Sequence, residues 1–101
     1  MTTRRPIRWT DHSAAAVNAL PSDQRAQATR LLEAIAMAPT AGAPYQRTRA
    51  GWLLRIASAY DTHVVYTIVY ELVGAAILVV DVQVFPWTPK HTDDPFPPDI
   101  R

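Results

Sequence analysis

The chain contains no cysteine, and this absence excludes disulfide bonds, thiolate catalysis and zinc sites built on cysteine. It also lacks any apolar run that approaches the ~20 residues of a membrane-spanning helix. Its first nine residues, MTTRRPIRW, carry charge without an apolar stretch behind them, so they do not predict a signal peptide. These absences lead us to expect a cytoplasmic protein with no membrane partner.

Lysine is almost absent, because nine of the ten cationic residues are arginine and only Lys90 is not. Residues 1–60 carry eight arginines against three carboxylates, for a net charge of +5, whereas residues 61–101 have a net charge of −4. Arginine is the better bidentate partner for phosphate, which favours a nucleic-acid contact. A GC-rich genome would produce the same preference for arginine.

With 101 residues, 49% of them hydrophobic, the chain is expected to form one domain that folds alone. The composition changes at residue 86, because residues 86–101 hold five of the nine prolines. Such a segment is neither a helix nor a central strand. We therefore divide the chain into a folded domain, 1–85, and a proline-rich extended tail, 86–101.

Two helices are predicted, over about residues 10–20 and 22–38. Thr10 or Asp11 is the expected N-cap of the first and Ser22 that of the second, while Pro39 ends the second. The short link makes the two helices an antiparallel hairpin. Each has apolar residues at helical spacing, namely Ala14, Val17 and Leu20 in the first and Ala28, Leu31, Leu32 and Ile35 in the second.

Strand-forming segments follow at residues 52–60, 62–71 and 75–85, after a loop at 40–51, and residues 4–9 predict a short edge strand. The short breaks favour antiparallel neighbours. In the last strand, alternation places Leu78, Val80, Val82 and Val84 toward the helices and Asp81, Gln83 and Phe85 on the other face. The predicted fold class is α+β, a two-helix hairpin packed on a small antiparallel β-sheet.

Three polar residues of this sheet form a candidate catalytic set. In a simple hairpin, Arg55 and His63 fall on one sheet face, and Gln83 shares it with Asp81. Arg55 would bind a phosphate, and His63, with a free pKa near ~6.5, would transfer protons. Alternatively, Arg55 pairs with Asp81 as a structural bridge, and His63 is a polar residue on a half-exposed face.

Four further residues are candidate RNA contacts. Arg47 and Arg49 lie in the loop before the strands, and Trp87 and Lys90 lie in the proline-rich segment. Cationic side chains suit the phosphate backbone, and an aromatic ring suits base stacking. A merely solvated loop, and a tryptophan that caps the edge of the core, are the alternatives.

Trp52 and Tyr66 are interpreted as core residues in preference to base-stacking platforms. The histidines at 12, 63 and 91 are too scattered in the sequence to predict a metal site. No cofactor is expected.

The chain resembles the RelE/ParE superfamily of bacterial toxins over roughly residues 6–85. Members commonly have a helix that ends near "LP", a second helix that ends in "P", then "G-aromatic-x-R-I" and "Y-R-V-V-Y". The matching segments here are Leu20-Pro21, Ala38-Pro39, GWLLRI at residues 51–56 and YDTHVVY at residues 60–66.

The resemblance implies a ribosome-dependent endoribonuclease that cuts mRNA, or an inhibitor of DNA gyrase, neutralised by a cognate antitoxin. The acidic, partly disordered kind of antitoxin would suit an arginine-rich surface. Two features depart from the nuclease branch: His63 replaces an arginine, and no basic segment with a tyrosine follows the last strand. The chain is therefore expected to be an mRNA endoribonuclease with a replaced catalytic set, a gyrase inhibitor, or an interaction module without activity.

Overall fold

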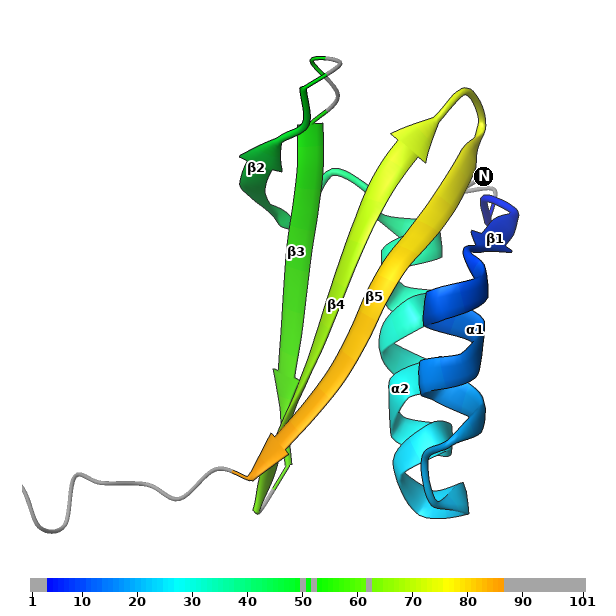
Figure 1. Ribbon diagram of the computed structural model, residues 1–101, viewed down its shortest axis with the longest axis vertical. Coiled ribbons are helices and arrows are strands. Elements are labelled where there is room, and N and C mark those ends of the chain that lie inside the picture. The colour runs from blue at the N-terminus through cyan, green and yellow to red at the C-terminus, as the bar shows by residue number, and fades with distance from the viewer. Residues whose placement is uncertain (1–3, 50, 52, 62, 87–101) are drawn as a thin grey trace, which may run out of the picture.

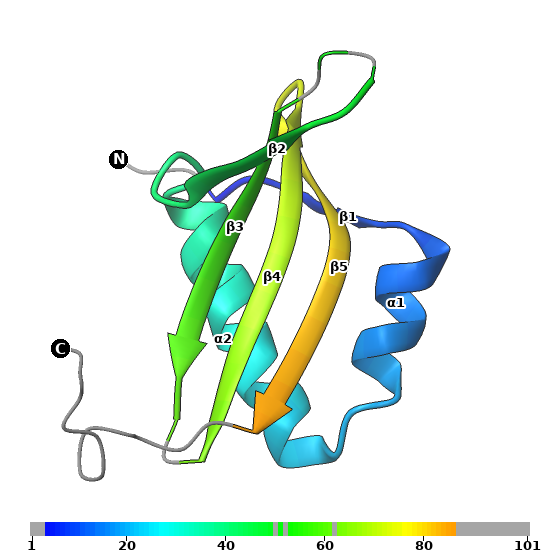
Figure 2. The same cartoon turned by 60° about the vertical axis from the view of Figure 1, so that its left-hand side comes forward.

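The computed structural model describes residues 4–49, 51, 53–61 and 63–86. Two helices pack on one face of a five-stranded sheet (Figures 1 and 2), which confirms the predicted α+β class. Neither described helix has the length and hydropathy that a membrane crossing needs. The elements are β1 (Ile7–Trp9), α1 (Asp11–Asn18), α2 (Ser22–Met37), β2 (Ala43–Arg47), β3 (Leu53–Tyr60), β4 (Val64–Val73) and β5 (Ala76–Pro86).

The strand order is β1-β5-β4-β3-β2. Strands β3, β4 and β5 form the predicted antiparallel meander. Strand β1 lies at the predicted edge position but runs parallel to β5, so the sheet is mixed and the prediction of a wholly antiparallel sheet was wrong. Two strands joined by a hairpin turn must be antiparallel. No such turn joins β1 to β5, so the direction of β1 is set by tertiary packing.

The predicted loop at 40–51 contains a strand that the sequence pattern did not indicate. Strand β2 pairs antiparallel with the first half of β3, and an irregularity interrupts the pairing between Pro44 and Gln46. All five of its residues are exposed. Gly42, Pro44 and Gly51 suggested a loop because such residues break central strands, but an edge strand tolerates proline.

The core lies between the helices and β4. Tyr66, Ile68 and Tyr70 alternate along β4 with at most 3% of their surface exposed, and Leu32 and Ile35 of α2 are similarly buried. The assignment of Tyr66 to the core is thus confirmed, whereas Trp52 lies outside the described residues. Apolar burial on this scale, worth ~1.5–3 kcal/mol for each large side chain, is the main stabilising contribution.

A β-bulge in β5 changes which of its residues face the helices. Val69 pairs with Asp81 while Tyr70 pairs with Val79, so Val80 is an extra residue. Val82 faces the core as predicted, but beyond the bulge the buried residues are Val79 and Ile77. The predicted helix-facing positions of Val80 and Leu78 were therefore wrong, because one inserted residue reverses the alternation.

The start of α1 is fixed to β5 by a buried serine. Thr10 is the N-cap, and its hydroxyl and the Ser13 hydroxyl form a reciprocal capping box. Ser13 is fully buried, and its Oγ also donates to the Val79 carbonyl oxygen at 2.7 Å. Helix α2 begins one residue earlier than its predicted cap implied, because Pro21 and not Ser22 is the N-cap, and Ser22 is the first helical residue. The fixed φ of proline suits the extended capping position.

Candidate functional site

The register of the meander separates the residues proposed as a catalytic set. Arg55 pairs with Tyr70, whose side chain is buried against the helices, so Arg55 lies on the helix-facing side of the sheet. Gln83 pairs with Thr67, which alternates with the buried residues of β4. Gln83 therefore lies on the opposite side of the sheet. The prediction that Arg55 and Gln83 share a face was therefore wrong.

The parity of the β3–β4 turn explains this outcome. The Asp61 amide donates to the Val64 carbonyl oxygen at 2.9 Å, so the loop between this last hydrogen-bonded pair has two residues. With an even loop, odd-numbered residues of β3 face the same way as even-numbered residues of β4. Arg55 and His63 would share a face only across a loop with an odd number of residues.

His63 is also distant from Gln83 along the sheet. It is exposed and precedes β4. Thr67, the partner of Gln83, lies four residues further on, which corresponds to roughly 13 Å at ~3.3 Å per residue. The three candidates Arg55, His63 and Gln83 are thus not brought together.

Arg55 instead holds the loop that joins α2 to β2. Its guanidinium donates to the Gly42 carbonyl oxygen at 3.0 Å, and the Tyr70 hydroxyl donates to the Pro39 carbonyl oxygen at 2.7 Å. Burial raises the pKa of the Tyr70 phenol, although the Gly42 backbone and Arg55 act in the opposite direction, so the hydroxyl keeps its proton and donates. The alternative interpretation of Arg55, a bridge to Asp81, is also wrong, because the two residues lie on opposite faces.

Asp81 forms a different polar group, which we call the Asp81 cluster: His12, Asp81 and Gln83. His12 Nε2 lies 3.0 Å from Asp81 Oδ1, and Gln83 Nε2 donates to Asp81 Oδ2 at 2.8 Å. Both carboxylate oxygens are thereby occupied. The His12 side chain is 74% exposed, so its ring is fixed on one side and open to solvent on the other. An imidazole oriented by a carboxylate is able to transfer protons to or from a bound molecule.

Sequence reasoning did not select His12, although it identified Gln83 and Asp81 as neighbours. His12 is the second residue of α1, whose start is tied to β5 through Ser13. The pairing of His12 with Asp81 therefore depends on the parallel docking of β1, which no local pattern indicates. The capping residue Thr10, directly before the helix, was the local signal that fixed where α1 begins.

The outer face of the sheet, turned away from the helices, is apolar with two carboxylates. Glu71 and Asp81 belong to this face by alternation. Among the described residues, the pairing of Arg8 in β1 with Leu78 places one cation on the same face. A face with this charge does not attract a polyanion. Its other side chains include Leu54, Ile56, Ser58, Tyr60, Val65, Thr67, Val69, Val73, Leu78, Gln83 and Phe85.

The proposed RNA contacts lie elsewhere or outside the described residues. Arg47 ends β2, and its guanidinium donates to the Gly51 carbonyl oxygen at 3.0 Å, which closes the β2–β3 loop. Arg49 is exposed in that loop. Trp87 and Lys90 lie outside the described residues.

No family model, curated protein or solved structure matches this chain. Within the described part of the chain, no three histidine, aspartate or glutamate side chains are grouped as a metal ion would require.

Proposed function

We propose that the chain is a RelE/ParE-type toxin that acts by binding a protein target, DNA gyrase, instead of cleaving mRNA. The observation that carries this choice is the separation of Arg55 and Gln83 by the sheet. RNA cleavage needs a phosphate-binding cation and proton carriers around one phosphate. Inhibition by binding needs no such set.

The charge of the two sides of the molecule also favours this proposal. Among the residues that the structure describes, the outer face of the sheet carries Glu71 and Asp81 against one cation, Arg8, and this excess of negative charge opposes binding of an RNA phosphate backbone there. Arg55 is already bonded within the fold. The toxin class itself rests on the resemblance over residues 6–85, and the helix hairpin followed by a meander is compatible with it.

A cognate antitoxin is part of the proposal. The helix side of the molecule has a groove of about 460 Å³ between β1, α1 and α2, and Trp9, which lines it, is 40% exposed. Arg25 lies at the same groove, where its guanidinium donates to the Leu20 carbonyl oxygen at 3.0 Å, and Arg4 there is paired with Glu33. An acidic, partly disordered segment with apolar residues would suit this combination.

A ribosome-dependent endoribonuclease that acts on mRNA is the second candidate, and the Asp81 cluster is the observation that favours it. In that case His12 would transfer the proton, Asp81 would orient the His12 ring, and Arg8 would bind the phosphate. This set differs from the one proposed from the sequence.

Two assays with the purified chain distinguish these functions: supercoiling of relaxed plasmid by gyrase, and primer extension on an mRNA under translation. We expect supercoiling to be inhibited and the mRNA to remain intact. The exposed double variant His63→Ala/Gln83→Ala should inhibit gyrase as well as the wild type does. Cleaved mRNA with unaffected gyrase would overturn the proposal, and loss of that cleavage in His12→Ala would establish the second candidate.

A further inference from the structure

One edge of the sheet is only half covered by its outermost strand. Strand β2 pairs with β3 over Leu53–Ile56, although β3 continues to Tyr60. Among the described residues, no strand borders residues 57–59 on the side away from β4. Figure 1 shows β2 beside the first part of β3, while the rest of β3 forms the edge of the sheet.

The backbone of Ser58 points out of this edge. In an antiparallel pair, the residues that exchange hydrogen bonds with the neighbour alternate with residues that point away from it. Asp61 is hydrogen-bonded to Val64 of the neighbouring strand, so every second residue before Asp61 in β3 also bonds to β4. The backbone groups of the two alanines beside Ser58 therefore face β4, and those of Ser58 face away from it. By the same alternation the backbone of Arg55 faces β4, so its β2 partner Pro44 is at a non-bonded position. This agrees with the absence of an N–H in proline. Ser58 is exposed and therefore offers one donor and one acceptor to an added strand.

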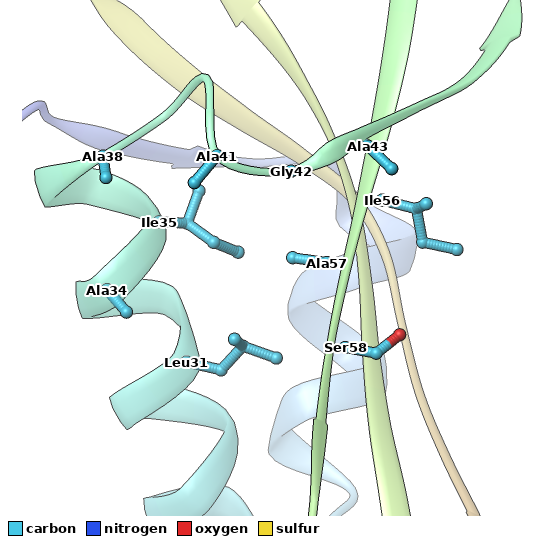
Figure 3. Close-up of a pocket in the computed structure, with 10 residues that line it drawn as sticks. All are labelled: Leu31, Ala34, Ile35, Ala38, Ala41, Gly42, Ala43, Ile56, Ala57 and Ser58. Atoms are coloured by element: carbon cyan, nitrogen blue, oxygen red, sulfur yellow. The ribbon is translucent and has the colours of Figure 1, made fainter.

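An apolar groove lies directly beside this edge (Figure 3). It has a volume of about 260 Å³ and separates α2 from β3, with the loop at residues 41–43 crossing one end. Figure 3 shows the side chains of Leu31 and Ile35 directed from α2 toward β3, and that of Ala57 directed back toward α2. Ala34 and Ala38 complete the helix side, and their small side chains leave the space open.

The size of the groove and its position select the kind of ligand. Pockets for drug-sized ligands have volumes of about 300–1,000 Å³, so this groove suits one large apolar side chain. A free strand edge beside a side-chain pocket is the arrangement used when an extended peptide joins a sheet. Lipids and nucleic acids do not supply the alternating N–H and C=O groups that the backbone of Ser58 requires.

A cation lies one helical turn from the groove. Arg30 precedes Ala34 by four residues, so the two positions are neighbours on the surface of α2. The Arg30 guanidinium donates to the neutral side-chain oxygen of Gln27 at 3.5 Å. A carboxylate would be a stronger partner, because hydrogen bonds between charged groups are roughly twice as strong as neutral ones.

We propose that this edge binds an extended segment of a partner protein, which adds a strand beside residues 57–59. One large apolar side chain of the segment enters the groove between α2 and β3, and an acidic residue of the segment pairs with Arg30. The inference goes beyond the proposed function, because it names a surface and a mode of docking that are the same whichever target the chain acts on.

The test selects peptides from a random 12-residue phage library on the full-length chain and measures their binding as synthetic peptides. We expect the selected peptides to combine an apolar residue with Asp or Glu and to slow amide exchange at Ser58. Ser58→Pro, which removes the outward N–H from an edge where proline is tolerated, should weaken binding at least 10-fold, whereas Ser58→Thr should not. Ala34→Trp, which fills the groove, should weaken binding similarly, and Ala26→Trp, on an exposed position of the same helix, is its matched control.

Circular dichroism and thermal unfolding of each variant establish that it folds before its binding is compared. The proposal is overturned if no peptide is selected, or if selected peptides bind Ser58→Pro and Ala34→Trp as well as the wild type. It is also overturned if light scattering shows a dimer that Ser58→Pro dissociates, because the edge would then be occupied by a second copy. None of these readouts depends on gyrase, so this proposal and the proposed function fail independently.

Discussion

A side chain at position 42 would collide with the tyrosine that holds the α2–β2 loop. A Cβ added to Gly42 would overlap the Tyr70 hydroxyl oxygen and lie 3.0 Å from Tyr70 Cζ. Tyr70 is fully buried and its hydroxyl donates to the Pro39 carbonyl oxygen, so the ring has no free space in which to move. Gly42 does not have a positive φ, so this collision is the main obstacle to alanine.

The expected loss of stability for Gly42→Ala has three contributions. Overpacking costs about 1–3 kcal/mol, and loss of the Tyr70–Pro39 hydrogen bond costs about 0.5–1.5 kcal/mol. Replacing glycine by alanine returns about 0.4–1 kcal/mol by restricting the unfolded chain. The net loss is therefore about 2 kcal/mol. In a Tyr70→Phe background the overlapping oxygen is absent, so the same substitution should cost about 1 kcal/mol or less.

Urea unfolding of the wild type, both single variants and the double variant measures this difference. The reasoning is refuted if Gly42→Ala costs less than about 0.5 kcal/mol, or if it costs the same in both backgrounds. Either result would mean that Tyr70 does not hold the loop in this way. The structural role assigned to Arg55, which bonds to Gly42 in the same loop, would then lose its basis.

Three further predictions concern stability. Ser13→Ala removes the buried hydroxyl that caps α1 and donates to Val79, and urea unfolding should show a loss of about 1–2 kcal/mol; an unchanged midpoint would contradict this role. Burial raises the folded-state pKa of Tyr70. The contribution of its protonated phenol to the free energy of unfolding is therefore complete below pH ~10 and is lost as the pH rises through the folded pKa. Tyr70→Phe should flatten the decline in stability above pH ~10 without abolishing it. The hydrogen bond from Arg4 lowers the pKa of Glu33. The contribution of the ionised Glu33 carboxylate to the free energy of unfolding is therefore present above pH ~4.3 and is lost as the pH falls through the folded pKa. Glu33→Gln should flatten stability slightly over that acidic range in low salt, and an identical acid profile would show that the exposed pair contributes nothing.

The helix hairpin and the meander were predictable because their signals are local. Helical spacing, the caps and Pro39 define the helices, and short breaks join the three strands. Gly74 shows how local this information is: its φ of +59° in the tight turn between β4 and β5 is one that glycine adopts readily. In β4 the face of each residue followed from alternation, as Tyr66 illustrates.

The candidate site was not predictable, because it depends on relations between strands. The face of Arg55 relative to Gln83 depends on whether the β3–β4 loop has an even or odd number of residues, and the breaks in the pattern do not define that parity. The extra residue at Val80 reverses the alternation within one strand without any glycine or proline to indicate it. His12 meets Asp81 only because β1 docks parallel to β5, across a separation of 69 residues.

Pulse labelling after induction of the chain alone in bacteria tests the central claim most directly, with thymidine and amino-acid incorporation followed side by side. The account predicts that thymidine incorporation falls first, and that it does so equally in the wild type and in His63→Ala/Gln83→Ala. Amino-acid incorporation that falls first would contradict it.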